Sequence, residues 1–235
     1  MSTHKLSIVV PAYNEKNTIE AIIGKIKAVD LGNDIEKEII VVDDGSKDGT
    51  REILKQIPGI RYIFYEKNLG KGGAMKTGFK NATGDILIPQ DADLEYDPND
   101  YLSVIKPIID GRTEMTLGMR IQPDKDWRRR KSLYWLSWFG NHAITLFTNL
   151  LYWNNAGEYE ACYKAFTKKL VDSIEVKSNG FEYDNELVCK ALKRGYKSID
   201  VPVRYYPRSY EEGKKINWKD GFRILWTILK YRFVD

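Results

Sequence analysis

The chain of 235 residues is 43% hydrophobic and 30% charged, which suits one large α/β domain or two small ones with a sizeable core. Its formal net charge of +4, from 37 basic and 33 acidic residues, is too small for a protein that coats nucleic acid. Two cysteines and two histidines exclude a disulfide scaffold, a four-cysteine zinc site and a histidine-rich metal site.

Short apolar runs alternate with helical patterns over the first hundred residues. Strands are predicted at residues 6–10, 38–42, 60–65 and 86–89, with helices after the first three of them. Strands that are apolar throughout and separated by helices are typical of a parallel sheet covered on both faces. In such sheets a ligand binds beyond the carboxyl ends of the strands. Polar clusters follow the predicted strands, at residues 13–15, 43–44, 68–73 and 91–95.

The clusters at residues 43–46 and 68–73 each have a structural and a functional interpretation. Asp43-Asp44-Gly45-Ser46 forms either a turn with a helix cap or an acceptor for a base or ribose. The glycine-rich stretch matches neither the P-loop nor the dinucleotide-binding pattern, because Met75 stands where each requires glycine. Lys71 at the start of the following helix is nevertheless well placed for a phosphate.

Two aspartates follow the fourth predicted strand. Asp91 and Asp93 are two residues apart, so in an extended chain their carboxylates project to one side and can share a divalent cation. An Asp-x-Asp sequence is common by chance, but its position at the predicted cleft favours an oxygen-ligand site for Mg2+ or Mn2+.

These clusters, in this order, resemble glycosyltransferase family 2, whose members have the GT-A fold. SIVVPAYNE, VVDDGSKDGT, NLGKGGAMKTG and DILIPQDADLEYDP match the opening motifs of that family. EACYKAF, FEYDNELVCKALKRGY and VPVRYYPRSYEEGKKINWKDG are similar to the polyprenyl-phosphate sugar transferases, which include dolichyl-phosphate mannose synthase and bacterial relatives. The resemblance covers residues 5–232 and implies a single GT-A domain with a mostly parallel, Rossmann-like central sheet.

The resemblance implies roles on the donor side. It places a nucleotide-contacting loop at Pro11, Tyr13 and Glu15, a base-binding acid at Asp43 or Asp44, and a donor-closing loop at Lys71. It places nucleotide-sugar contacts at Asp91, Ala92 and Asp93, and it implies a divalent cation, Mg2+ or Mn2+, held by Asp91, Asp93 and Glu95. Relatives commonly have Gln where this chain has Glu95, so the extra negative charge is expected to tighten cation binding.

The resemblance also implies roles on the acceptor side. Arg120 matches an arginine near the acceptor phosphate, although serine is more usual than Met119 beside it. Arg130 and Lys131, in the densest basic run, are expected at the same phosphate unless this run is only a solvated surface. Arg208 and Lys215 are expected to neutralise the leaving diphosphate, with Arg208, Asp93 and Arg120 as the catalytic residues.

The implied reaction is transfer of a hexose from a nucleotide-diphosphate sugar, with GDP-mannose favoured, to polyprenyl phosphate with inversion. A UDP-glucose donor and a glycan hydroxyl acceptor are alternatives, and the hydroxyl would need a carboxylate base at Glu158, Glu160 or Asp184. A nucleotidyltransferase and a non-catalytic membrane-binding module are further alternatives, but the second leaves Asp91 and Asp93 without a role. Residues 1–95 are expected to bind the nucleotide sugar and residues 96–235 the acceptor.

Two segments of the second half combine aromatic and basic residues. Residues 132–153 form an apolar pattern with a polar seam, and residues 218–233 repeat it with lysines and arginines. We expect both helices to lie in the lipid headgroup layer, with burial or a dimer interface as the alternative for the first. With no signal peptide or transmembrane helix expected, the protein would be peripheral on the cytoplasmic face of a membrane.

Overall fold

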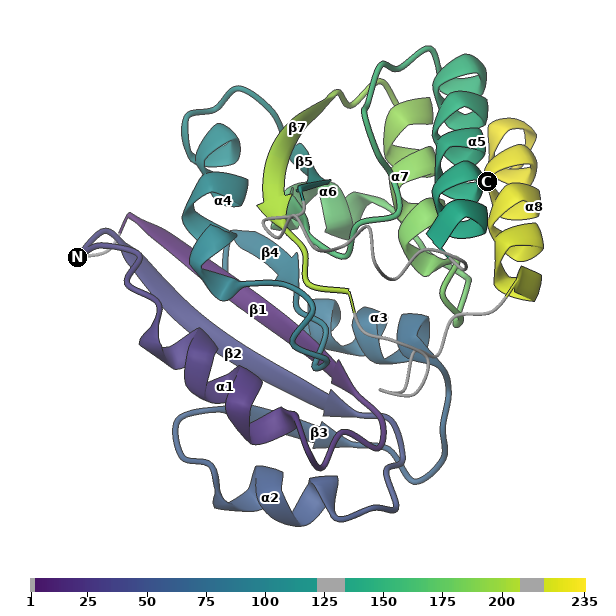
Figure 1. The fold of residues 1–235 in the computed structure, drawn as a ribbon. Coiled ribbons are helices and arrows are strands. Elements are labelled where there is room, and N and C mark those ends of the chain that lie inside the picture. The colour runs from purple at the N-terminus through teal and green to yellow at the C-terminus, as the bar shows by residue number, and fades with distance from the viewer. Residues whose placement is uncertain (1–2, 122–133, 208–217) are drawn as a thin grey trace.

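The computed structural model describes residues 3–121, 134–207 and 218–235, with side chains described for 3–121, 139–207 and 220–235. The described chain forms one seven-stranded sheet with helices on both faces (Figure 1). The strands are β1 His4–Ala12, β2 Ile35–Asp43, β3 Arg61–Phe64, β4 Ile86–Pro89, β5 Met115–Ile121, β6 Lys164–Thr167 and β7 Ser198–Arg204. The helices are α1 Ile19–Ala28, α2 Thr50–Gln56, α3 Lys71–Asn81, the 3-10 turn η1 Pro98–Asp100, α4 Tyr101–Ile109, α5 Tyr134–Tyr152, α6 Lys168–Ser173, α7 Tyr183–Lys193 and α8 Trp218–Phe233.

The strand order is β3-β2-β1-β4-β6-β5-β7, and the predicted mostly parallel sheet is confirmed. β1 pairs in parallel with both β2 and β4, while β6 runs antiparallel between β4 and β5. The chain leaves β1 for β2 and β3 on one side and returns to β4 on the other. Such a reversal opens a crevice at the carboxyl ends of the central strands, which is where α/β sheets bind ligands.

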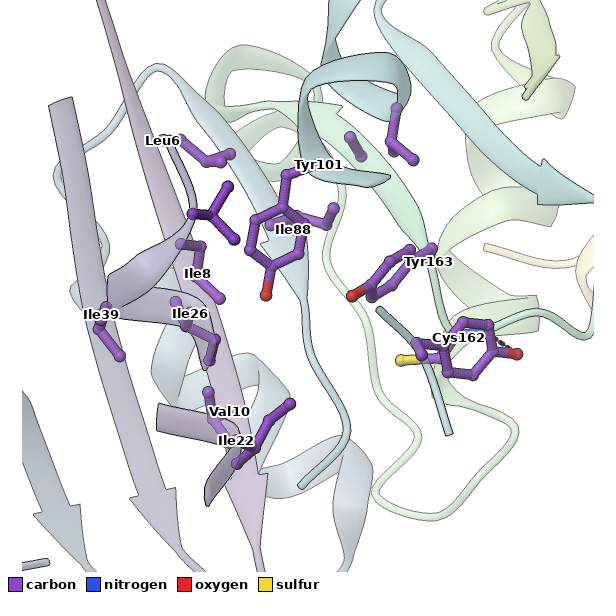
Figure 2. Close-up of a cluster of buried hydrophobic side chains, with 14 of the residues drawn as sticks. Leu6, Ile8, Val10, Ile22, Ile26, Ile39, Ile88, Tyr101, Cys162 and Tyr163 are labelled. Atoms are coloured by element: carbon purple, nitrogen blue, oxygen red, sulfur yellow. Dashed lines mark hydrogen bonds between the residues drawn. The ribbon is translucent and has the colours of Figure 1, made fainter. Parts of the chain in front are cut away.

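Each face of the sheet carries its own core. On one face, α1 and α4 cover β1, β2 and β4; Figure 2 shows Ile22 and Ile26 of α1 beside Leu6, Ile8 and Val10 of β1. On the other face, α3 and α7 pack on the sheet, and α5 and α8 pack in turn on α7 (Figure 1). β1 is buried without interruption from Leu6 to Val10, because both sides of a strand inside a doubly covered sheet are buried.

Two helix-interior glycines give opposite predictions for stability. A Cβ on Gly78 of α3 would lie 2.1 Å from Cγ1 of the buried Val9, whereas a Cβ on Gly24 of α1 would meet nothing within 4 Å. Gly78→Ala is therefore expected to destabilise the fold by about 1–3 kcal/mol through overpacking. Gly24→Ala should stabilise it by up to about 1 kcal/mol, since alanine is the better helix former. Urea unfolding of both variants measures the change in the free energy of unfolding. Equal changes in the two variants would contradict the packing of α3 on β1.

The polar seam of α5 faces the protein body together with the buried Ile144 and Tyr152, and its other apolar residues include the exposed Phe139, Leu146 and Leu150. Thr148 is buried and Asn149 bonds to the backbone of Ala156 and to the hydroxyl of Tyr159. α8 buries Ile224, Ile228 and Tyr231 together with Asp220 and Thr227, and exposes Phe222, Trp226 and Phe233. Trp153, just after α5, is 89% exposed. We call the outward surface the α5–α8 apolar face; its exposed residues are Phe139, Leu146, Leu150, Trp153, Phe222, Trp226, Leu229 and Phe233.

Among the described helices, none is both long and apolar enough to cross a membrane. α5 and α8 lie side by side at one edge of the molecule (Figure 1), and each of them exposes large apolar side chains.

Candidate active site

The loops after β1 and β2 are tied together at the crevice. The hydroxyl of Ser46 accepts from the backbone N–H of Asn14, at 2.8 Å, and that of Thr50 accepts from the N–H of Glu15, at 3.0 Å. The Glu15 carboxylate accepts from the Thr18 hydroxyl at 2.8 Å, so this predicted nucleotide contact also stabilises the start of α1. Pro11 pairs with Val42 inside the sheet.

The two aspartates after β2 have different partners. Asp44 is buried and its two oxygens accept from the backbone N–H groups of Leu69 and Gly70, at 2.7 and 2.9 Å. Burial raises the pKa of Asp44, although these two hydrogen bonds oppose the shift. Asp43 is also buried, and its Oδ2 accepts from Arg51 Nε at 2.7 Å. Its Oδ1 is the single buried side-chain polar atom of the described residues that has no hydrogen-bond partner.

The glycine-rich loop is held against the loop that precedes α7. A Cβ on Gly70, whose φ is +94°, would lie 2.4 Å from the carbonyl oxygen of Asn179. The N–H of Gly73 donates to that same oxygen at 3.2 Å. Only glycine fits this close approach, which brings the start of α3, and with it Lys71, to the crevice.

Lys71 forms an ion pair with the first aspartate of the Asp-x-Asp sequence. Its Nζ lies 2.6 Å from Oδ1 of Asp91. Burial alone would lower the pKa of Lys71, but the charge of Asp91 raises it, and the charge of Lys71 lowers the pKa of Asp91 against the effect of burial. The adjacent Cys162 is buried, and burial with the Asp91 charge raises its thiol pKa, so it is a neutral apolar residue as expected.

Asp93 and Glu95 lie on one tight turn. Oδ1 of Asp93 accepts from the N–H of Glu95 at 3.1 Å, and Leu94 between them has a φ of 63°, a left-handed conformation that is uncommon for leucine. Ala92 is buried beneath the turn. Oε2 of Glu95 accepts from the hydroxyl of Tyr205 at 3.1 Å.

The residues of this turn fit a cation bound jointly with a substrate. No group of three close His, Cys, Asp or Glu side chains suited to a metal occurs in the part of the chain that the structure describes. Mg2+ is commonly held by one or two carboxylates and completed by substrate phosphates and water. The oxygen donors of Asp93 and Glu95 match that arrangement, while Asp91 is paired with Lys71.

Arg120 at the end of β5 is fixed by two neighbours. Its backbone N–H and its Nε donate to the carboxylate of Glu158, at 2.9 and 2.6 Å, and a second guanidinium nitrogen pairs with the same group. Its guanidinium carbon lies 4.9 Å from the ring centroid of Tyr205. Arg120 and Glu95 therefore contact the same tyrosine, Arg120 at its ring and Glu95 at its hydroxyl.

Lys164 is a functional candidate that the sequence patterns do not identify. This lysine is 2% exposed; its Nζ donates to the carbonyl oxygen of Ala161 and lies 3.6 Å from Oδ2 of Asp184. Oε1 of Glu160 accepts from the amide of Asn185 at 2.8 Å, and burial raises the pKa of Glu160. The signal was a single lysine at the start of the short strand β6, since a buried lysine is usually paired with an acid.

Four predicted site residues, Arg130, Lys131, Arg208 and Lys215, lie outside the described residues. The exposed Tyr13 lies in the turn after β1, whose neighbours Asn14 and Glu15 bond to the loop after β2. The structure thus brings Asp43, Asp44, Lys71, Asp91, Asp93, Glu95 and Arg120 to one edge of the sheet.

The comparisons with known proteins agree with this geometry. A family model described as glycosyl transferase family 2 matches residues 7–174, more than half of the chain. An uncharacterized protein of Methanocaldococcus jannaschii is 30% identical over 230 residues, covering 96% of this chain and 91% of that protein. UDP-N-acetylglucosamine–dolichyl-phosphate N-acetylglucosaminyltransferase of Methanococcus voltae is 28% identical over 250 residues, covering 97% of this chain and 96% of that protein.

A solved structure shares the fold. Glucosyl-3-phosphoglycerate synthase of Mycobacterium tuberculosis, in complex with Mn2+, UDP and phosphoglyceric acid, has a TM-score of 0.73 at 20% identity. The similarity covers 99% of this chain and 80% of that chain. The expected GT-A fold is thereby confirmed.

Proposed function

We propose that this chain, which belongs to glycosyltransferase family 2, transfers one hexose from a nucleotide-diphosphate sugar to the phosphate of a polyprenyl phosphate. The observation that carries the proposal is the placement of Arg120 and the Asp93–Glu95 turn around one side chain, Tyr205. A donor diphosphate and an acceptor phosphate would then meet in one crevice lined by charges that suit both. Residues 1–95 would bind the donor and residues 96–235 the acceptor.

The chemistry needs charge stabilisation rather than a proton acceptor. A phosphate oxygen of the acceptor attacks the anomeric carbon, the carbon–oxygen bond to the diphosphate breaks, and the nucleoside diphosphate leaves with the electron pair. A divalent cation at Asp93 and Glu95 would supply Lewis-acid stabilisation of the leaving diphosphate. Lys71 would exchange its ion pair with Asp91 for a contact with that diphosphate, and Arg120 would orient the acceptor phosphate. A displacement of this kind inverts the anomeric configuration.

A phosphate acceptor fits the carboxylates of the crevice better than a hydroxyl acceptor does. A hydroxyl would need a carboxylate base, but Glu158 is bound by Arg120 and Asp184 lies 3.6 Å from the ammonium of Lys164. Glu160, whose pKa burial raises, is the remaining candidate for such a base. A carboxylate that a cation holds is a weaker base, since the cation stabilises its ionised form. A phosphate acceptor is already ionised, so it needs no carboxylate base.

The donor base would be recognised at Asp43 rather than Asp44. Asp44 uses both oxygens on the backbone of the glycine-rich loop, whereas Oδ1 of Asp43 has no partner. A ring N–H of uracil or guanine is a donor of the required kind. This oxygen is covered in the structure, so a base would reach it once the neighbouring groups move aside.

Asp43→Asn is expected to lower the affinity for the nucleoside diphosphate by about tenfold to a hundredfold, because one hydrogen bond to a charged group is worth about 1.5–3 kcal/mol. Calorimetric titration of UDP and GDP measures this. Asp44→Asn is the matched control. It should weaken the binding of both nucleotides equally, because it disturbs the glycine-rich loop. Equal losses in the two variants for both nucleotides would contradict a base contact at Asp43.

GDP-mannose is the donor implied by the likeness to dolichyl-phosphate mannose synthase, and UDP-N-acetylglucosamine is a second candidate. The second is favoured by the relative from Methanococcus voltae, whose name gives UDP-N-acetylglucosamine as its donor.

Membrane docking through the α5–α8 apolar face would bring the crevice to its lipid. This face exposes two tryptophans and three phenylalanines, and Arg223 and Lys230 of α8 are exposed beside them. Aromatic side chains with flanking cations suit the headgroup layer of a bilayer, so we propose peripheral binding at a cytoplasmic membrane surface.

The proposed reaction is tested with purified protein, Mn2+ or Mg2+, and a short polyprenyl phosphate. Radiolabelled GDP-mannose, UDP-N-acetylglucosamine and UDP-glucose are supplied separately. One of them should label the lipid, and no labelled lipid from any donor would overturn the proposal.

A further inference from the structure

Tyr205 lies between the donor side and the acceptor side of the crevice. It follows β7 directly and is 8% exposed. Its hydroxyl donates to Oε2 of Glu95 at 3.1 Å, and its ring centroid lies 4.9 Å from the guanidinium carbon of Arg120. The hydroxyl therefore contacts one functional residue and the ring face another.

The backbone around Tyr205 is fixed from both sides. Its N–H donates to the carbonyl oxygen of Ile121 at 3.1 Å, and the N–H of Tyr206 donates to the carbonyl oxygen of Glu95 at 2.8 Å. Tyr205 also forms an isolated antiparallel bridge with Tyr96, whose ring centroid lies 5.2 Å away. A side chain held in this way has little rotamer freedom, so its hydroxyl and ring keep their directions without substrate.

Arg120 and Glu95 each depend on a second group for direction. Glu158 holds the guanidinium of Arg120 by hydrogen bonds, and the ring of Tyr205 lies 4.9 Å from the guanidinium carbon. The Tyr205 hydroxyl donates a hydrogen bond to Oε2 of Glu95 and thereby sets the orientation of the carboxylate. Hydrogen-bond partners of this kind orient metal-binding carboxylates, and their loss commonly costs 10–100-fold in metal affinity.

We infer that Tyr205 is a positioning residue that aligns the cation site with the acceptor-phosphate site, its hydroxyl acting on Glu95 and its ring on Arg120. This inference rests on the proposed function. It assigns two separable tasks to one side chain, so two substitutions distinguish them. Tyr205→Phe removes the hydroxyl and keeps the ring, whereas Tyr205→Leu removes both.

The experiment measures cation binding apart from turnover. Mn2+ is titrated into the protein with saturating nucleoside diphosphate and followed by calorimetry, and KM for the short polyprenyl phosphate is measured separately. For Tyr205→Phe we expect a Kd for Mn2+ at least tenfold higher with KM for the lipid within twofold of wild type. For Tyr205→Leu we expect the same loss for Mn2+ and an additional rise of about fivefold in KM for the lipid. Tyr206→Phe, at the exposed neighbouring tyrosine, is the matched control and should change neither value.

The outcomes separate this inference from the proposed function. Unchanged Mn2+ affinity in Tyr205→Phe would overturn the role of the hydroxyl, and equal lipid KM in both variants would overturn the role of the ring. If Tyr205→Leu does not fold, Tyr205→Phe alone still decides whether the hydroxyl supports cation binding through Glu95. A wild-type protein that labels no lipid would overturn the proposed function, while the Mn2+ titration still tests the contact with Glu95.

Discussion

Asp93→Ala is expected to lower turnover by at least about a hundredfold, because charge stabilisation by a bound cation contributes several kcal/mol to such a reaction. Asp93 stands on the turn that holds Glu95, at the edge where Lys71 and Arg120 also meet. The substitution removes a carboxylate from the proposed cation site without removing a core side chain. Initial rates at saturating Mn2+ or Mg2+ measure the loss.

Asp93→Asn separates the charge of this residue from the shape of its turn. Asparagine keeps an oxygen that can accept from the N–H of Glu95, so the turn should persist and the melting temperature should stay within about 2 °C of wild type. We expect Asp93→Asn to be as inactive as Asp93→Ala. Asp110→Asn, after α4, is the control and should keep full activity. More than about a tenth of wild-type turnover in either Asp93 variant would exclude this residue as a cation ligand.

Replacing Trp153 and Trp226 by glutamate is expected to abolish binding to anionic vesicles. Both tryptophans are exposed on the α5–α8 apolar face, and transfer of one large aromatic side chain out of water is worth about 2–3 kcal/mol. The double variant should bind vesicles at least a hundredfold more weakly in a flotation assay. Its activity on a short, dispersed polyprenyl phosphate should stay within twofold of wild type.

Leu102→Glu is the control for this prediction, because Leu102 is an exposed apolar residue of α4, outside the α5–α8 apolar face. It should leave vesicle binding unchanged. Vesicle binding by the double variant equal to that of wild type would contradict membrane docking through α5 and α8. A dimeric wild type and a monomeric double variant, neither of which binds vesicles, would show instead that this face joins two copies of the chain.

The first half of the fold could be predicted because each of its strands is a compact apolar run. The predicted strands at residues 6–10, 38–42, 60–65 and 86–89 match β1 to β4 closely. β6 is harder to predict, since it is four residues long and contains the buried Lys164, which pairs with an acid twenty residues later. Its antiparallel direction depends on pairing with β4 and β5, which no local pattern encodes.

The orientation of α5 could not be settled from the sequence. Its polar residues predict a helix with two faces, but the pattern does not say which face meets the protein. In the structure Asn149 faces the protein body, because its side chain forms hydrogen bonds with the backbone of Ala156 and with the hydroxyl of Tyr159. Ile144 and Tyr152 are buried on that same side, whereas Leu146 and Leu150 stay exposed, and this exposed apolar surface is the structural support for membrane docking.

The individual site residues were predicted by motif, but their partners were not. Asp91, Asp93 and Glu95 lie close together in the sequence, so a sequence pattern identifies them. Tyr205 lies 110 residues after Glu95, and Glu158 lies 38 residues after Arg120. Contacts at that separation arise when β5, β7 and the turn after β4 meet in the folded sheet, and only the structure reveals them.

The most direct test of the central claim compares a lipid phosphate with one acceptor that lacks the phosphate and one that lacks the lipid. Polyprenyl phosphate, the corresponding polyprenol and 3-phosphoglycerate are each incubated with the active donor and Mn2+, and the products are analysed by mass spectrometry. We expect a lipid product that contains one phosphate and one sugar, a hexose or an N-acetylhexosamine according to the donor, formed with an equal amount of nucleoside diphosphate, from polyprenyl phosphate alone. Transfer to polyprenol or to 3-phosphoglycerate at a comparable rate would contradict the claim that this chain glycosylates a lipid phosphate.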